Sequence, residues 1–191
     1  RHYNLKRITE LLERLDNPHK KQRFVHIGGS KGKGSTATYI ASILTQAGYR
    51  TGLFTSPHFV SPRERCCIDN IPISQNDFAQ CLFDIQPAVA SVLKQQDRWG
   101  RLSFFELYTA LSIYYFAQQE VDWSVIEVGL GGRLDATNIV QPELSVITPI
   151  SLEHQKVLGH TIADIADQKA GIIKSRTPLI LGPQPKSAES I

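Results

Sequence analysis

An apolar segment that runs into a glycine-rich loop and then into a helical pattern constrains the fold of this chain most strongly. Residues 24–27 read as a buried strand, and the spacing of apolar residues from Thr36 to Ala47 predicts a helix. Between them, residues 28–36 read Gly-Gly-Ser-Lys-Gly-Lys-Gly-Ser-Thr. Backbone N–H groups in such a loop can surround an anion at the N-terminus of the helix. The sequence therefore predicts a phosphate-binding loop.

A nucleoside triphosphate is the ligand expected for this loop. Lys33 offers a mobile positive charge to the phosphates, and Ser35 or Thr36 offers a hydroxyl to Mg²⁺. The predicted nucleotide-binding residues are Gly29, Ser30, Lys31, Gly32, Lys33, Gly34, Ser35 and Thr36. Gly34 separates the lysine from the hydroxyl residues, so the strict P-loop spacing is not met. A flexible surface connection is the alternative, and the flanking strand and helix argue against it.

Strand and helix patterns alternate along the rest of the chain. Short apolar segments predict strands at 51–55, 123–128, 144–148 and 179–181, with a small hairpin at 67–72 and a polar tail at 182–191. Helices are expected at 5–15, 74–92, 104–118 and 162–170, with capping boxes at Ser74/Asp77 and Ser103/Glu106, a cap at Thr161 and a kink at Pro87. This order predicts an α/β fold with a mostly parallel sheet flanked by helices. In such folds ligands gather at the carboxyl ends of the strands.

Composition narrows the class of protein. A chain of 191 residues with 41% hydrophobic residues can bury a sizeable core, and its length suits one domain. The net charge of +3 is too small to indicate a nucleic-acid partner. Cys66, Cys67 and Cys81 form neither a disulfide framework nor a metal-binding knuckle. With no signal peptide and no apolar run long enough for a membrane span, we expect a cytoplasmic location without a membrane partner, although residues can be missing before Arg1.

Three clusters fall at predicted strand ends. Glu127 lies in an apolar strand, where a buried carboxylate needs a cation or hydrogen-bond donors, and a metal ion beside nucleotide phosphates would serve. The alternative is a structural carboxylate satisfied by the backbone or by Arg133. Gly129, Gly131 and Gly132 follow it and favour close approach of the backbone to a ligand.

The other two clusters contain a histidine and two lysines. His154 follows the 144–148 strand, where a neutral imidazole could ligate a second divalent ion; a structural or surface histidine is the alternative. Lys169 and Lys174 lie near the end of the last predicted helix. Taken alone, they read as solvated lysines that complement the helix dipole.

Several motifs occur together in one order: GGSKGKGST, TSPHFVSPRERC, SFFE, IEVGLGGRLDATN, SLEH and DQKAGIIK. In this order the chain resembles the ATP-binding domain of folylpolyglutamate synthases and bifunctional dihydrofolate synthases, which belong to the Mur ligase superfamily. The resemblance covers nearly the whole chain, and it implies a P-loop NTPase-like fold of the type found in the central domain of Mur ligases. It also implies that residues 1–191 form an incomplete ATP-binding domain without the family's Rossmann-like C-terminal domain. We therefore expect this polypeptide alone not to ligate efficiently.

The resemblance assigns roles to single residues. It implies that Lys33 binds the ATP phosphates, that one Mg²⁺ lies between Ser56 and Glu127, and that His154 helps to hold a second. Lys169 corresponds to a lysine that family members carry as a carbamate, an anionic group suited to Mg²⁺. The implied catalytic residues are Lys33, Glu127, His154 and Lys169, and the implied metal-binding residues are Ser56, Glu127, His154 and Lys169. Residues 63–65 are placed near the pterin-containing substrate, and Asp135 and Asn138 support the site.

The implied reaction joins L-glutamate to a folate or to dihydropteroate through an acyl phosphate, in folate biosynthesis and one-carbon metabolism, and we expect a monomer. Four residues depart from the family pattern: Ser30 and Lys31 in the loop, Glu153 where an aspartate is usual, and Cys67 where an arginine is usual. Another Mur-type ligase of an acid and an amino acid, or an ATP-binding module without catalysis, remains the alternative.

Overall fold

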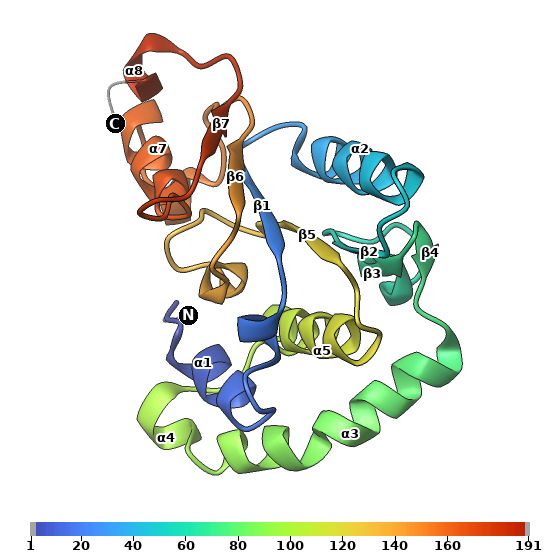
Figure 1. Ribbon diagram of the computed structural model, residues 1–191. Coiled ribbons are helices and arrows are strands. Elements are labelled where there is room, and N and C mark those ends of the chain that lie inside the picture. Colours follow the sequence, from blue (N-terminus) through green and yellow to red (C-terminus); the bar gives the residue numbers. More distant parts are fainter. Residues whose placement is uncertain (1–2, 190–191) are drawn as a thin grey trace.

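A single mixed sheet forms the centre of the computed structural model, which describes residues 3–189. Seven strands lie in the order β4-β3-β2-β5-β1-β6-β7 (Figure 1). The strands are β1 Phe24–Gly28, β2 Thr51–Phe54, β3 Cys66–Ile68, β4 Ile71–Pro72, β5 Trp123–Glu127, β6 Leu144–Ile147 and β7 Leu179–Leu181. Strands β2, β5, β1, β6 and β7 run parallel, whereas β3 and β4 form an antiparallel hairpin at one edge. The predicted α/β class is confirmed.

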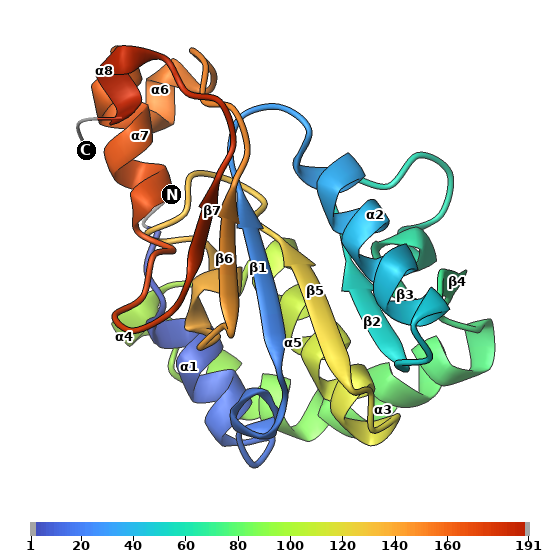
Figure 2. The same ribbon diagram turned by 45° about the horizontal axis from the view of Figure 1, so that its top comes forward.

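Helices cover both faces of the sheet. They are α1 Lys6–Glu13, α2 Lys33–Gln46, α3 Gln75–Leu93, α4 Gln96–Trp99, α5 Phe104–Gln118, α6 Gln155–Leu158, α7 Ile162–Ala170 and α8 Lys186–Glu189. Short 3-10 turns lie at Pro18–Lys21, Pro62–Arg65 and Ala136–Ile139. Helices α1, α3 and α5 lie on the face opposite α2 (Figure 2). None of the helices within residues 3–189 has the length and apolar character that crossing a bilayer requires.

Alternation along the strands divides the core between the two faces. Phe24, Phe54 and Ile126 pack with α1, α3 and α5 in the larger apolar cluster. Their chain neighbours Val25, Leu53 and Val125 pack with Ala37 and Ala41 of α2 in a second cluster. Successive side chains of a strand point to opposite faces, so uninterrupted apolar strands can serve both layers. A third cluster holds α6, α7 and α8 against the ends of β5 and β6.

Helix caps follow the sequence expectations closely. The Ser103 hydroxyl accepts the Glu106 backbone N–H at 3.2 Å, and the Glu106 carboxylate accepts the Ser103 N–H at 2.8 Å, which completes the predicted capping box. Thr161 caps α7 in the same way with Asp164. At α3 the Ser74 hydroxyl accepts the Asp77 N–H at 3.0 Å, but within residues 3–189 no return bond reaches the Ser74 N–H. Only half of that predicted box therefore forms.

Several predicted boundaries are wrong. Helix α2 begins at Lys33 rather than Thr36, because Gly32 adopts a left-handed conformation and lets the helix start directly after it. Strand β5 ends at Glu127, one residue early. Helix α3 continues through Pro87 to Leu93, one residue beyond the predicted end. The predicted polar tail contains the short helix α8, and its last two residues lie outside the described range.

Candidate active site

The carboxyl ends of three parallel strands bring the predicted site residues to one edge of the sheet. Ile27 of β1 lies opposite Glu127 of β5, and Gly28 lies opposite Ile147 of β6. The glycine-rich loop follows β1, the 128–135 loop follows β5, and the segment 148–154 follows β6. Because the strands are parallel and adjacent, these three connections leave the sheet side by side, at the edge where α/β folds bind ligands.

The phosphate loop depends on two glycines with positive φ. Gly29 has φ of 133°, and a Cβ there would lie 1.9 Å from the Thr148 hydroxyl oxygen, so only glycine fits without a shift. Gly32 has φ of 82° and forms the N-cap of α2, which has no side-chain cap. The first backbone N–H groups of α2 are thus available to an anion. The Lys33 ammonium donates to the Ser30 carbonyl oxygen at 3.4 Å, within the same loop.

Ser30 joins the phosphate loop to the segment after β6. Its backbone N–H donates to the Pro149 carbonyl at 3.1 Å. Its buried hydroxyl donates to the Ser151 carbonyl at 3.0 Å and accepts the Ser151 N–H at 3.0 Å. Lys31, Ser35 and Thr36 are exposed or half-buried, as side chains that face a ligand would be. The unusual serine at position 30 therefore has a structural partner within the protein.

Glu127 is buried, with only 4% of its surface exposed. One carboxylate oxygen, Oε2, accepts the Ser56 backbone N–H at 2.8 Å. The other, Oε1, accepts no hydrogen bond within residues 3–189, and a Cβ at Gly34 would lie 3.5 Å from it. Burial raises the pKa of Glu127, while the Ser56 N–H and the charge of Lys33 oppose that rise. This carboxylate thus lies against the N-terminus of α2 with an oxygen free for a cation.

Arg133 does not satisfy Glu127, contrary to the structural alternative. Its guanidinium donates to the Asp167 carboxylate at 2.8 Å, and both side chains are about half exposed. The backbone part of that alternative does hold, through Ser56. Ser56 itself precedes a cis peptide bond to Pro57.

Lys169 is buried rather than solvated, so the expectation drawn from its position alone is wrong. It is 1% exposed, and its ammonium donates to the Gly29 carbonyl at 2.6 Å and to Glu153 Oε1 at 2.6 Å. Burial lowers the pKa of Lys169, and the hydrogen bond and charge of Glu153 oppose that shift. Lys174 is half-buried and donates to the Asn138 carbonyl at 3.3 Å. The contact between Lys169 and Glu153 was not anticipated, although Glu153 adjoins His154 in the sequence.

His154 lies at the N-cap of α6 with φ of 44° and ψ of 36°. This left-handed conformation is uncommon for a residue other than glycine. Its side chain is exposed, and the imidazole forms no hydrogen bond to any part of the chain between residues 3 and 189. No cluster of three or more His, Cys, Asp or Glu side chains within that range could hold a metal ion alone.

The glycines after β5 lie close to other parts of the protein, so a larger side chain at these positions would clash. A Cβ at Gly129 would lie 2.4 Å from the Phe105 ring, and one at Gly132 would lie 2.7 Å from the Gln168 carbonyl. Gly129 and Gly132 therefore let the 128–135 loop pack against α5 and α7. Close approach of this backbone to a ligand stays a prediction. Asp135 holds the following turn, accepting the Thr137 N–H at 3.0 Å and the Leu130 N–H at 2.8 Å.

Beneath this loop, Asn138 and His26 complete a buried polar framework. The Asn138 amide donates to the carbonyls of Arg133 and Gly171, each at 3.0 Å. His26 Nε2 lies 2.8 Å from the Thr137 hydroxyl, and burial lowers the pKa of His26 to about 3. A neutral imidazole within β1 therefore supports the loop from below.

The 56–65 loop carries two very exposed apolar side chains. Phe59 is 95% exposed and Val60 is 89% exposed. Glu64 anchors the loop by accepting backbone N–H groups from Phe59 at 2.8 Å and Ser61 at 2.7 Å, and these bonds lower its pKa. Arg65 donates to His58 Nδ1 at 2.8 Å, and its guanidinium carbon lies 5.3 Å from the Phe104 ring centroid. The loop is held internally and presents its apolar tip outward.

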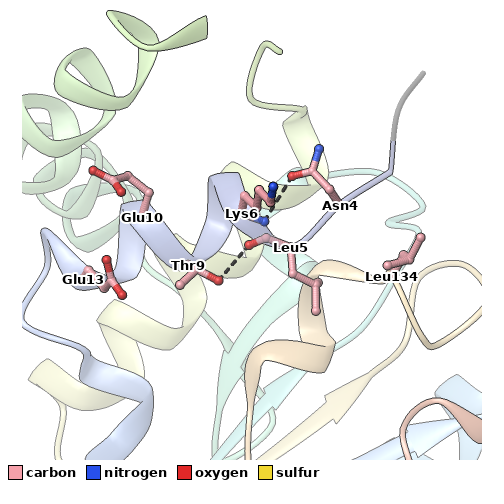
Figure 3. A pocket seen from close by; sticks show the side chains of 7 residues that line it. All are labelled: Asn4, Leu5, Lys6, Thr9, Glu10, Glu13 and Leu134. Atoms are coloured by element: carbon pink, nitrogen blue, oxygen red, sulfur yellow. Dashed lines mark hydrogen bonds between the residues drawn. The ribbon is translucent and has the colours of Figure 1, made fainter. Parts of the chain in front are cut away.

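A hollow lies beside α1 (Figure 3). It measures about 490 Å³ and is lined by Asn4, Leu5, Lys6, Thr9, Glu10, Glu13 and Leu134. None of these residues was predicted as a site residue. The thiols of Cys66, Cys67 and Cys81 are buried, and none of them forms a disulfide in the described part of the chain.

Comparison with known proteins connects this geometry to a group of enzymes. No protein-family model matches the chain. It is 42% identical over 189 residues to the dihydrofolate synthase/folylpolyglutamate synthase of Bacillus subtilis (strain 168), a match that covers 98% of this chain and 44% of that protein. Its fold matches Mycobacterium tuberculosis folylpolyglutamate synthase complexed with ADP and AMPPCP with a TM-score of 0.93 and 39% identity, covering 98% of this chain and 43% of that one.

A solved FPGS–AMPPCP–folate complex is similar to the same extent. Its TM-score is 0.92 at 42% identity, over 97% of this chain and 45% of that one. This chain therefore spans less than half the length of the proteins that it matches.

Proposed function

We propose that this chain, which is homologous to folylpolyglutamate and dihydrofolate synthases over nearly its whole length, is the ATP-binding part of such a ligase. The single observation that carries the proposal is the set of three connections at one sheet edge. There, the uncapped N-terminus of α2, Lys33 and the buried Glu127 meet. The AMPPCP complexes of similar structures support a nucleotide as the ligand of this edge.

Within the proposed site, the protein supplies charge and orientation. The backbone N–H groups at the start of α2 and the Lys33 ammonium bind the phosphates and stabilise the negative charge that develops during phosphoryl transfer. The carboxylate of the acid substrate attacks the γ-phosphorus, ADP leaves, and an acyl phosphate forms. The glutamate amine then displaces phosphate to give an amide. No side-chain nucleophile is needed.

The donor set at Glu127 fits Mg²⁺. The ion prefers oxygen ligands and is usually bound by one or two carboxylates together with substrate phosphates. Glu127 offers the free oxygen Oε1 beside the phosphate loop, and the Ser56 side chain lies next to the backbone N–H that fixes the same carboxylate. When bound there, the ion neutralises charge on the transferring phosphoryl group. His154 and a carbamate on Lys169 are the proposed ligands of a second ion.

The proposed substrates are a folate or dihydropteroate together with L-glutamate. The names of the relatives and the folate complex of a similar structure support them. The exposed Phe59 and Val60 give the 56–65 loop an apolar surface compatible with an aromatic substrate. A cytoplasmic location is part of the same proposal, and fractionation of the source cells would test it.

Nucleotide-dependent ligation is tested by measuring ADP release from the full-length gene product. The acid substrate would be pteroate, tetrahydrofolate or neither, each with and without glutamate. We expect ADP release that requires both glutamate and one of the two acids. Release with neither acid, or binding of ATP without coupled turnover, would reject a folate ligase in favour of another Mur-type ligase or a non-catalytic module.

Lys33→Met, which removes the charge near the phosphates, should reduce turnover at least a hundredfold.

A further inference from the structure

The 56–65 loop is closed at its base and fastened to the body of the protein there. The Thr55 backbone N–H donates to the Arg65 carbonyl at 3.1 Å, so the two ends of the loop lie together. The Tyr108 hydroxyl, from α5, donates to the Pro62 carbonyl. The base of the loop therefore has anchors that do not involve its tip.

The tip of the loop, Phe59 and Val60, has no comparable support from packing, because both side chains are almost fully exposed. Three consecutive backbone N–H groups surround the Glu64 carboxylate instead. Oε2 accepts the N–H of Phe59 at 2.8 Å, and Oε1 accepts those of Val60 at 3.1 Å and Ser61 at 2.7 Å. Hydrogen bonds to an ionised carboxylate are stronger than those between neutral groups. Glu64 is thus the side chain that holds the tip in one conformation.

The loop begins beside the proposed site of phosphoryl transfer. Its first residue, Ser56, donates its backbone N–H to Glu127 at 2.8 Å, and Glu127 lies against the N-terminus of α2. The carboxylate of the acid substrate must react there, next to the phosphates. The exposed apolar tip is then a surface available to the aromatic part of that substrate.

We propose that Glu64 is a positioning residue for the acid substrate. By accepting the N–H groups of residues 59–61, it holds the Phe59 and Val60 side chains where they contact the aromatic part of that substrate. A tip that is already ordered loses less conformational entropy on binding, so this order lowers the KM for the acid. The inference rests on the proposed function, because it assumes a folate-type acid at this loop. Glu64 itself touches neither substrate nor reacting atoms and acts through the tip.

The test measures KM and kcat by glutamate-dependent ADP release from the full-length gene product, with ATP and whichever of pteroate and tetrahydrofolate supports turnover. Glu64→Gln replaces one acceptor oxygen with an amide NH₂ group, which leaves a backbone N–H of the tip without its acceptor. We expect its KM for the acid to rise at least fivefold. Glu64→Ala, which removes both acceptors, should raise that KM at least tenfold. In both variants, kcat and the KM for ATP should stay within twofold of the wild type.

Asp164→Asn is the matched control. It makes the same chemical change at another carboxylate that accepts consecutive backbone N–H groups, those of His160 at 3.0 Å and Thr161 at 2.9 Å, at the start of α7. Its KM for the acid should stay within twofold of the wild type. The melting temperature of every variant is measured in parallel. A Glu64→Gln variant that melts earlier but keeps the wild-type KM would show a structural role only and overturn the inference.

A double-mutant cycle shows whether Glu64 acts through the tip. In a Phe59→Ala/Val60→Ala background, which has no apolar tip to position, Glu64→Ala should raise the KM for the acid by less than twofold. Equal rises in both backgrounds would overturn the inference, and so would an unchanged KM in the Phe59→Ala/Val60→Ala variant. If Glu64→Ala does not fold, Glu64→Gln decides in both backgrounds. If the wild type releases no ADP in response to either acid, it is the proposed function that fails.

Discussion

Gly29→Ala tests whether the phosphate loop is shaped by steric necessity at one position. The glycine has φ of 133°, and the added Cβ would lie 1.9 Å from the Thr148 hydroxyl oxygen and 2.8 Å from the Thr148 carbonyl oxygen. A strained backbone costs about 1–3 kcal/mol. Overpacking against a buried neighbour costs about 1–3 kcal/mol more. We therefore expect the free energy of unfolding to fall by about 2–6 kcal/mol in total.

Gly32→Ala is the matched control for this substitution. Its φ is 82°, but no atom lies within 4 Å of the added Cβ. Only the left-handed backbone contributes there, so we expect a loss of about 1–2 kcal/mol. Equilibrium unfolding in urea measures both variants, with an unchanged slope showing that the unfolded state is comparable.

Thr148→Ala identifies the cause of the loss. Alone, it removes the hydroxyl that donates to the Gly28 carbonyl at 3.2 Å and should cost about 1 kcal/mol. Combined with Gly29→Ala, it removes the closest clashing atom and should restore part of the lost stability. The steric reasoning is refuted if Gly29→Ala and Gly32→Ala lose the same free energy, or if Thr148→Ala costs as much in the Gly29→Ala background as alone.

Two further perturbations address buried charge. Burial raises the pKa of Glu127 above its ordinary value of 4.5. The contribution of the protonated carboxyl group to the free energy of unfolding is therefore complete below pH 4.5 and is lost as the pH rises through the pKa of the folded state. Without nucleotide or Mg²⁺, Glu127→Gln should therefore increase the free energy of unfolding at pH 8 and leave it nearly unchanged at pH 4; a gain of equal size at both pH values would contradict this. The Arg7–Glu106 ion pair joins α1 to the cap of α5 at 2.8 Å and is buried at both side chains. Arg7→Met or Glu106→Gln should each cost about 3–5 kcal/mol in urea unfolding, and the double variant should lose less than the sum, whereas additive losses would show that the two side chains do not interact.

Much of the fold and part of the candidate site could be predicted from local sequence. The capping box at Ser103 and the start of α7 after Thr161 formed as expected, because each depends on residues three positions apart. The strand before the phosphate loop could be predicted because a short apolar run that ends in glycines is typical of a buried strand followed by a turn. Glu127 was found for a related reason, since a carboxylate in an apolar strand must have a partner.

The partners themselves could not be predicted. Arg133 was a reasonable partner for Glu127 by proximity in sequence, yet it pairs with Asp167, while Glu127 is bound by the backbone of Ser56. The glycines of the 128–135 loop were predicted to let the backbone approach a ligand, and the structure shows a packing requirement as well, since side chains at Gly129 and Gly132 would meet Phe105 and α7. In each case the residue type indicated that a hydrogen-bond partner or a close contact was needed. The packing of distant elements determined which residue supplied it.

By itself, the sequence determined the strand before the phosphate loop, the loop itself, the helix after it and the alternation of strands and helices that predicts a mostly parallel sheet. These follow from residue periodicity and from the backbone freedom of glycine, which act over a few neighbouring positions. Only the tertiary structure decided that Lys169 is buried and that its ammonium joins Gly29 to Glu153. Lys169 and Gly29 are 140 positions apart, so their contact exists only because parallel pairing of β1 with β6 brings the following segments to one edge. The free energy of burying a charge depends on that placement, which no local pattern contains.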